Sequence, residues 1–216
     1  MNIEIRTLNE EETYTIYCQH LKKDFPKAET KPFPILRKGI REGYYDAYGA
    51  YMCGELVGYA FFVKAVRDGQ TYALLDYFAV VKEKRNSGIG TEILRKLTPE
   101  KLHFGFIIIE SESFTEADEE EVRRRRARRI RFYERSGAVR TELAGRVNGV
   151  DYEILLLESG EYSMKADKEK TVELICSVYM EFYDFLWFPT PPSSVCRIEK
   201  KKGTARPGDG SEVGGT

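Results

Sequence analysis

Apolar residues recur along the first 160 positions with two different spacings. Short alternating or continuous apolar runs predict strands, and apolar residues spaced three or four positions apart predict helices. The first kind of spacing predicts strands at about residues 3–8, 47–53, 56–66, 72–81, 104–110, 138–141 and 152–158. The second predicts helices at about residues 9–23, 35–42, 88–97 and 119–136.

The order of these elements indicates the fold class. Strands and helices alternate along the chain, and residues 106–109 are apolar throughout, as in a strand that is covered on both faces. Gly54-Glu55 predicts a hairpin turn between two of the strands, and Gly43 and Gly137 each follow a predicted helix as a stop signal. We therefore expect an α/β domain over residues 1–160. Its centre is a mixed, partly parallel, twisted sheet of about seven strands with helices on both faces.

The pattern changes after about residue 160. Residues 171–188 are apolar and aromatic but carry acidic residues, which predicts an amphipathic helix. We expect residues 161–200 to form a C-terminal extension that packs on the domain or on a partner subunit, for example in a homodimer. Residues 201–216 are basic and then glycine-rich, which is typical of a disordered tail.

Charge gives little support for a nucleic-acid partner. The 216 residues carry a formal net charge of −1, with 42% hydrophobic and 32% charged residues. The arginine run at residues 123–131 follows Glu119, Glu120 and Glu121, so that acidic and basic residues stand four apart on one helix. This pattern favours an exposed, salt-bridged helix over a nucleic-acid surface.

The cysteine and histidine residues do not suggest a metal site. None of Cys18, Cys53, Cys176 and Cys196 forms a closely spaced pair, and the chain has two histidines. We expect four free thiols in a reducing compartment. No secretory signal and no apolar stretch of membrane-spanning length is visible, so we expect a cytoplasmic protein without a membrane partner.

The segment from Asp76 to Thr91 carries the clearest chemical signal. It places a strand before a polar turn and a glycine-bearing turn before a helix. The first amides of a helix lack partners and lie at the positive end of the helix dipole, so they bind phosphate well. Gly88 and Gly90 let an anion approach the backbone, and Arg85 adds a positive charge. An ordinary strand-to-helix turn is the alternative for this pattern taken alone.

Two blocks of the sequence resemble the GNAT family of N-acetyltransferases. The first, Arg85-Asn86-Ser87-Gly88-Ile89-Gly90, is similar to the family's coenzyme A motif, in which Arg or Gln is followed three residues later by Gly. The second, residues 132–138, is similar to the family's aromatic-Tyr ending of the next helix. The resemblance covers about residues 3–157 and implies a sheet that splays between its fourth and fifth strands.

The resemblance implies roles for specific residues. The pantetheine arm of acetyl-CoA would lie in the splay against the strand, and the pyrophosphate would lie on the turn, through Phe78, Ala79, Val80, Arg85, Asn86, Ser87, Gly88, Ile89, Gly90 and Thr91. Tyr133 matches the tyrosine that protonates the leaving thiolate, with simple aromatic packing as the alternative. Glu110 is the first candidate for the base that takes the amine proton, Asp76 is the second, and a water chain is the third.

One position departs from the family pattern. Relatives often have Asn about seven residues before the tyrosine, whereas this chain has Arg126. The arginine is expected to reach a phosphate or to face solvent. Other arginines of the run could contact the coenzyme's 3′-phosphate.

The sequence therefore predicts an enzyme that transfers acetyl from acetyl-CoA to a primary amine of a small molecule or peptide. The amine would attack directly in a ternary complex, without a metal. A non-catalytic acetyl-CoA-binding regulatory module is the alternative, and Tyr133 favours the enzyme because such a module does not need it.

Overall fold

The structure is a computed structural model, which describes residues 1–27, 29–115, 117–160, 162–165, 167–186 and 196–201. The strands are β1 (Glu4–Thr7), β2 (Tyr45–Met52), β3 (Glu55–Arg67), β4 (Gln70–Val80), β5 (Phe106–Glu112), β6 (Val139–Val147), β7 (Val150–Glu158) and β8 (Cys196–Lys200). The helices are α1 (Glu10–Ile16), the π-helix η1 (Tyr17–Leu21), α2 (Lys22–Asp24), α3 (Phe33–Glu42), the 3₁₀ turn η2 (Lys82–Lys84), α4 (Ile89–Lys96), α5 (Pro99–Leu102), α6 (Glu120–Arg135) and α7 (Lys168–Leu186).

The strands form one mixed sheet in the order β1-β2-β3-β4-β5-β7-β6-β8. Among these described strands only β4 and β5 pair in parallel, and the other neighbours pair antiparallel. The expected mixed α/β fold is confirmed, with eight described strands in place of about seven. The additional strand, β8, pairs with β6 at the sheet edge, and its alternate residues Cys196 and Ile198 pack in or against the apolar core.

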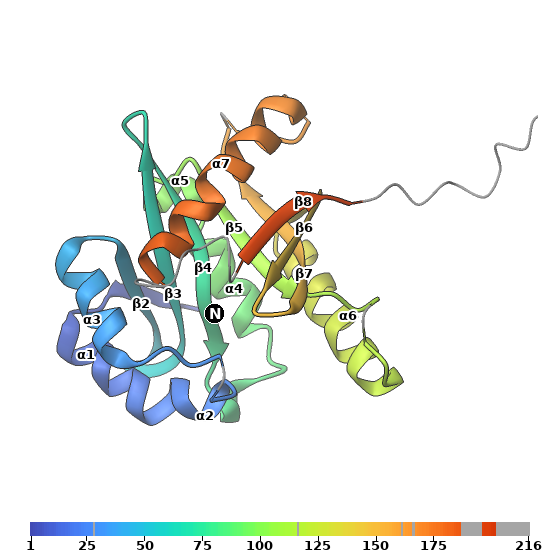
Figure 1. The fold of residues 1–216 in the computed structure, drawn as a ribbon. Helices are drawn as coiled ribbons and strands as arrows, with labels where there is room; N and C mark the ends of the chain where they lie inside the picture. The colour runs from blue at the N-terminus through green and yellow to red at the C-terminus, as the bar shows by residue number, and fades with distance from the viewer. Residues whose placement is uncertain (28, 116, 161, 166, 187–195, 202–216) are drawn as a thin grey trace, which may run out of the picture.

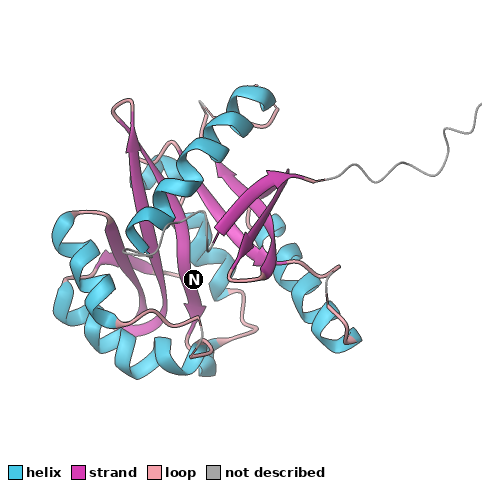
Figure 2. Ribbon diagram, in the orientation of Figure 1, coloured by secondary structure: helices cyan, strands magenta, loops and turns pink. Residues whose placement is uncertain are grey.

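Helices cover both faces of this sheet (Figures 1 and 2). One face packs against α1, η1, α3 and α7, and its core contains Tyr59, Phe61 and Phe106. The opposite face packs against α4 and α6, and its core contains Phe62 and Ile107. Because strand side chains alternate between faces, these continuous apolar runs supply both cores.

Local signals in the sequence explain several helix boundaries. Asn9 caps α1 in a capping box, in which its side chain accepts from the Glu12 amide and the Glu12 carboxylate accepts from the Asn9 amide. Gly43 ends α3 in the left-handed region with φ of 79°, as its position predicts. The helix expected at 119–136 spans Glu120–Arg135, and α5 lies where the sequence predicted no element.

The predicted C-terminal helix is present as α7, which begins three residues earlier than expected. Figure 1 shows α7, in orange, lying across the sheet, where it contacts β3 and β4. Val172, Ile175, Val178 and Phe182 on α7 are buried in the same core as β3 and β5. Of the tail predicted at 201–216, residues 202–216 lie outside the described residues. Among the helices that the structure describes, none is long and apolar enough to cross a membrane.

Candidate active site

The sheet opens into a wedge between β4 and β5. The two strands pair at Ala73 with Ile107, Leu74 with Ile108 and Leu75 with Ile109. Beyond these pairs β4 continues beside β3 as far as Val80, and β5 continues beside β7 as far as Glu112. The strands therefore diverge after Leu75 and Ile109, between the fourth and fifth strands as the family resemblance implied.

A β-bulge lies at the vertex of this wedge. Phe61 of β3 pairs with Tyr77 and Phe62 pairs with Leu75, so Asp76 is an extra residue in β4. A bulge bends its strand and interrupts the regular backbone pairing. It thereby accounts for the divergence of β4 from β5 beginning at this residue.

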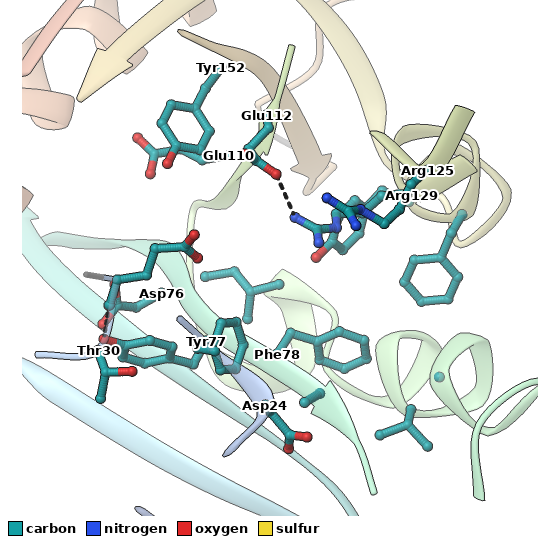
Figure 3. A pocket seen from close by; sticks show the side chains of 18 of the residues that line it. Asp24, Thr30, Asp76, Tyr77, Phe78, Glu110, Glu112, Arg125, Arg129 and Tyr152 are labelled. Atoms are coloured by element: carbon teal, nitrogen blue, oxygen red, sulfur yellow. Dashed lines mark hydrogen bonds and ion pairs between the residues drawn. The ribbon is translucent and has the colours of Figure 1, made fainter. Parts of the chain in front are cut away.

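The wedge opens into a cavity of about 1020 Å³. Figure 3 shows Asp76 and Tyr77 on one side of this cavity, Glu110 and Tyr152 on another, and Arg125 and Arg129 projecting from α6. Of the residues expected to bind the coenzyme or to act in catalysis, those that line the cavity are Phe78, Ala79, Val80, Arg85, Asn86, Gly88, Gly90, Thr91, Glu110 and Tyr133.

Two expected coenzyme-binding residues have side chains elsewhere. Ser87 is exposed, and its hydroxyl donates to the Lys84 carbonyl at 2.5 Å. Ile89 is buried in the core beneath α4. Any contact of these two residues with a ligand would therefore be through the backbone.

The glycine turn has the geometry of an anion site. Gly88 is the N-cap of α4 with φ of 82°, and no side chain from the described residues caps the helix there. The first amides of α4 are thus left for an external acceptor. A Cβ at Gly90 would lie 3.2 Å from the Phe132 ring and 3.3 Å from Val80 Cγ2, so glycine also allows α4, α6 and β4 to pack closely.

Arg85 is held by the protein itself. Its guanidinium donates to Asp24 Oδ1 at 2.5 Å and to the Val80 carbonyl at 2.9 Å. Asp24 also accepts from the Tyr59 hydroxyl. The arginine expected beside the phosphate therefore fastens the end of β4 to α2, and its charge is offset by a carboxylate.

Other arginines face the cavity. Arg125, Arg128, Arg129 and Arg135 of α6 are among its lining residues. The sequence predicted an exposed, salt-bridged helix here. Only part of α6 fits that prediction, namely the part where Glu120 pairs with Arg123 and Arg124.

Arg126 occupies neither of its expected positions. It is partly buried and donates to Glu112 at 2.7 Å and to the Ser113 carbonyl at 3.0 Å. Its side chain therefore holds the end of β5 against α6.

Tyr133 reaches the cavity from the face of the sheet that α4 and α6 cover. It is 8% exposed and packs against Phe132, which in turn stacks on Phe78. Within the described part of the chain its hydroxyl has no side-chain hydrogen-bond partner. Burial raises the pKa of the Tyr133 phenol above its ordinary value of 10.0, so the hydroxyl keeps its proton and can act as a donor.

Asp76 is engaged on both carboxylate oxygens. Oδ1 accepts from Lys31 Nζ at 2.6 Å and Oδ2 accepts from the Tyr45 hydroxyl at 2.6 Å. The Asp76 side chain is 7% exposed, so this is a largely buried ion pair. These partners make Asp76 a poorer candidate base than Glu110.

Glu110 lies directly across the wedge with a different set of partners. The Tyr183 hydroxyl lies 2.7 Å from Oε1 and 2.8 Å from Oε2, and the Tyr179 hydroxyl donates to Oε1. Burial raises the pKa of the Glu110 carboxyl, while the two tyrosines and Lys31 act in the opposite direction. A carboxylate with a raised pKa is better suited to accept a proton near neutral pH.

The sequence did not single out Tyr179 or Tyr183 as site residues. The signal available for them was their spacing of four residues, which places both hydroxyls on one face of a predicted helix. The partner of that face could not be read from the pattern. As for metals, no group of three or more His, Cys, Asp or Glu residues is placed to hold one in the described ranges.

Comparisons with solved structures give the same fold. A GNAT-family protein from Bacteroides thetaiotaomicron is 21% identical with a TM-score of 0.56, over 83% of this chain and 98% of that one. An N-acetyltransferase from Staphylococcus aureus Mu50 is 12% identical with a TM-score of 0.53, over 73% and 98%. A dodecameric spermidine N-acetyltransferase from Vibrio cholerae is 12% identical with a TM-score of 0.54, over 76% and 98%.

Sequence comparison assigns the family. No curated protein sequence matches the chain. The sequence profile of the acetyltransferase (GNAT) family, however, matches residues 11–138, which is more than half of the chain and includes the wedge, the glycine turn and Tyr133. The chain is therefore a member of the GNAT family of acetyltransferases.

Proposed function

We propose that the protein transfers the acetyl group of acetyl-CoA to a primary amine of a small molecule or peptide by direct attack in a ternary complex. One observation carries the proposal. A single cavity joins the open amides of α4, the wedge beside β4, the Tyr133 hydroxyl and the Glu110 carboxylate. These are the groups that binding a diphosphate, seating a thioester arm and moving two protons require.

The coenzyme would be held mainly by backbone. Its pyrophosphate would accept from the amides that follow Gly88, and its pantetheine arm would run along Phe78, Ala79 and Val80 toward the vertex of the wedge. The divergence of β4 from β5 leaves the cavity-side edge of β4 without a strand partner among the described residues in this stretch. This edge is therefore available to pair with the amides of the arm.

Groups on both strands of the wedge, together with Tyr133, would carry out the reaction. The amine must be neutral to attack, and Glu110 would take its proton directly or through one water. The thioester carbonyl carbon would then bond to nitrogen, and the oxyanion would accept from a backbone amide at the Asp76 bulge. Collapse of this intermediate would break the carbon–sulfur bond, and Tyr133 would protonate the leaving thiolate.

The test is turnover of acetyl-CoA with a panel of primary amines, read as free thiol release and as a mass gain of one acetyl group on the amine. We expect both signals to appear together for at least one acceptor. Acetyl-CoA binding without transfer to any acceptor would support the non-catalytic alternative instead.

A further inference from the structure

The C-terminal helix contributes directly to the cavity. Tyr183 of α7 is one of the lining residues. Helix α7 lies beyond residues 11–138, which match the family profile. Its buried side chains pack on the same sheet face that Glu110 occupies, in the core shared by Phe106 and Ile108. The helix is therefore in place to act on the chemistry at the vertex of the wedge.

The contact between α7 and the site is made at one carboxylate. Glu110 receives hydroxyl hydrogen bonds from Tyr179 and Tyr183, and within the described residues it has no ion-pair partner. Tyr179 is fully buried and does not line the cavity, so it approaches Glu110 from the core. Tyr183 approaches from the cavity side. Two hydroxyls from different directions fix the plane of the carboxylate as well as its position.

The sheet is shaped to admit the Tyr179 hydroxyl. A Cβ at Gly145 of β6 would lie 2.7 Å from Tyr179 Oη and 3.0 Å from Ile154 Cδ1. Real Cβ atoms essentially never approach another atom as closely as 2.7 Å. Glycine at this position thus leaves the space that the hydroxyl needs to reach Glu110.

We propose that Tyr179 and Tyr183 are positioning residues that hold the Glu110 carboxylate in the orientation that accepts the proton of the attacking amine. The C-terminal helix is thereby part of the acetyl-transfer site. This inference rests on the proposed function. It assigns to α7 a role that packing alone would not require.

Glu110 also interacts with other ionisable groups. Lys31 and Asp76 face it from the loop before α3 and from β4, and they act on its pKa in opposite directions. The pKa values of Tyr152 on β7 and Cys196 on β8 are raised, mainly by burial and secondly by the negative charge of Glu110. Among all these neighbours, the hydroxyls of Tyr179 and Tyr183 lower the Glu110 pKa most, so their removal raises that pKa further.

The experiment is the pH profile of turnover in Tyr179→Phe, Tyr183→Phe and the double variant. Turnover rises as Glu110 loses its proton, so a higher pKa moves the acid limb of the kcat profile to higher pH. We expect a shift of about one pH unit for each hydroxyl, the size of one charge-assisted hydrogen bond. The alkaline plateau and the KM for acetyl-CoA should stay as in the unmodified protein.

A matched control is Tyr72→Phe. Tyr72 lies on β4 in the same core, and its hydroxyl bonds Tyr162 away from the cavity. This variant loses a similarly buried hydroxyl and should keep the original pH profile. Gly145→Ala provides a second route, because it displaces the Tyr179 hydroxyl without changing the tyrosine, and it should shift the acid limb in the same direction.

A second measurement separates this inference from the proposed function. In protein labelled with ¹³C at the glutamate carboxyls, NMR titration reports the Glu110 midpoint without any turnover. A midpoint that rises in the tyrosine variants together with the acid limb supports the inference. An unchanged midpoint, or a uniform loss of kcat at every pH, overturns it and leaves only packing. Absence of acetyl transfer in the unmodified protein would instead contradict the proposed function.

Discussion

Asp76 and Glu110 occupy matching places on neighbouring strands, because each directly follows the last residue pair that joins β4 to β5. Their surroundings nevertheless differ. Asp76 is neutralised by Lys31, whereas the hydrogen-bond donors to Glu110 from side chains in the described ranges are neutral hydroxyls. Two carboxyl groups at equivalent positions thereby receive different partners. Burial raises the pKa of Glu110, which favours proton uptake by that residue.

Glu110→Gln should lower turnover most at pH values above the raised Glu110 pKa and below the pKa of the substrate amine. Burial raises the pKa of Glu110 above 4.5, so the carboxylate that accepts a proton becomes populated as the pH rises through that raised value. At alkaline pH the substrate amine is already neutral, and the difference between the two proteins should narrow. Steady-state kcat across the neutral and alkaline range measures this. A ratio of rates that is the same at every pH would assign Glu110 a structural role.

Tyr133→Phe should reduce kcat by about 10²-fold, as expected for loss of a general acid. Coenzyme affinity should change little, because the ring and its packing on Phe132 remain. Calorimetry with coenzyme A and steady-state kinetics separate the two effects. Tyr48→Phe is the control, since Tyr48 packs on the same sheet face but does not line the cavity. Equal kcat in both variants would mean that Tyr133 only packs.

Gly88→Glu should abolish coenzyme binding. The substitution puts a negative side chain at the N-terminus of α4, where the phosphates are expected, and a Cβ on a backbone with φ of 82°. Gly43→Glu is a matched control at the end of α3, because Gly43 has φ of 79° and a Cβ added there would meet no described atom within 4 Å. Both variants should lose about 1 kcal/mol of stability. Only the first should lose affinity in calorimetry.

Arg128→Glu should weaken coenzyme binding about tenfold or more. Arg128 lines the cavity from α6, and reversing its charge replaces attraction for a phosphate with repulsion. The effect should diminish as salt is added, because the side chain is exposed. Arg131→Glu makes the same charge change on the same helix outside the cavity lining, and its dissociation constant should match that of the unmodified protein.

The sequence predicted the fold and the backbone geometry of the glycine turn. The glycine turn, the aromatic-Tyr block and the alternating strands depend on local backbone geometry and on periodic burial, both of which a sequence displays directly. The left-handed Gly43 and Gly88 are examples, because residues that cannot adopt such backbone easily are excluded there.

The rest of the site depends on distant pairings that a linear pattern does not contain. Arg85 was expected beside the phosphate, yet its guanidinium bonds Asp24, 61 residues earlier. Glu110 was identified from its place at the end of a strand, yet its partners Tyr179 and Tyr183 lie 69 and 73 residues later. Which helix covers which sheet face decides these contacts, and periodicity shows only that each helix has an apolar face.

The extra residue in β4, Asp76, determines where the sheet opens but not which side chains form its two cores. Leu75 and Phe78 lie on the sheet face that α4 and α6 cover, and Tyr77 and Ala79 lie on the opposite face. If Asp76 were deleted and β4 paired regularly with β3, each of these side chains would stay on its present face. Such a deletion would remove the bend and the carboxylate together while keeping both cores. One inserted amino acid therefore distinguishes a sheet that opens between two neighbouring strands from one in which those strands stay paired along their whole length.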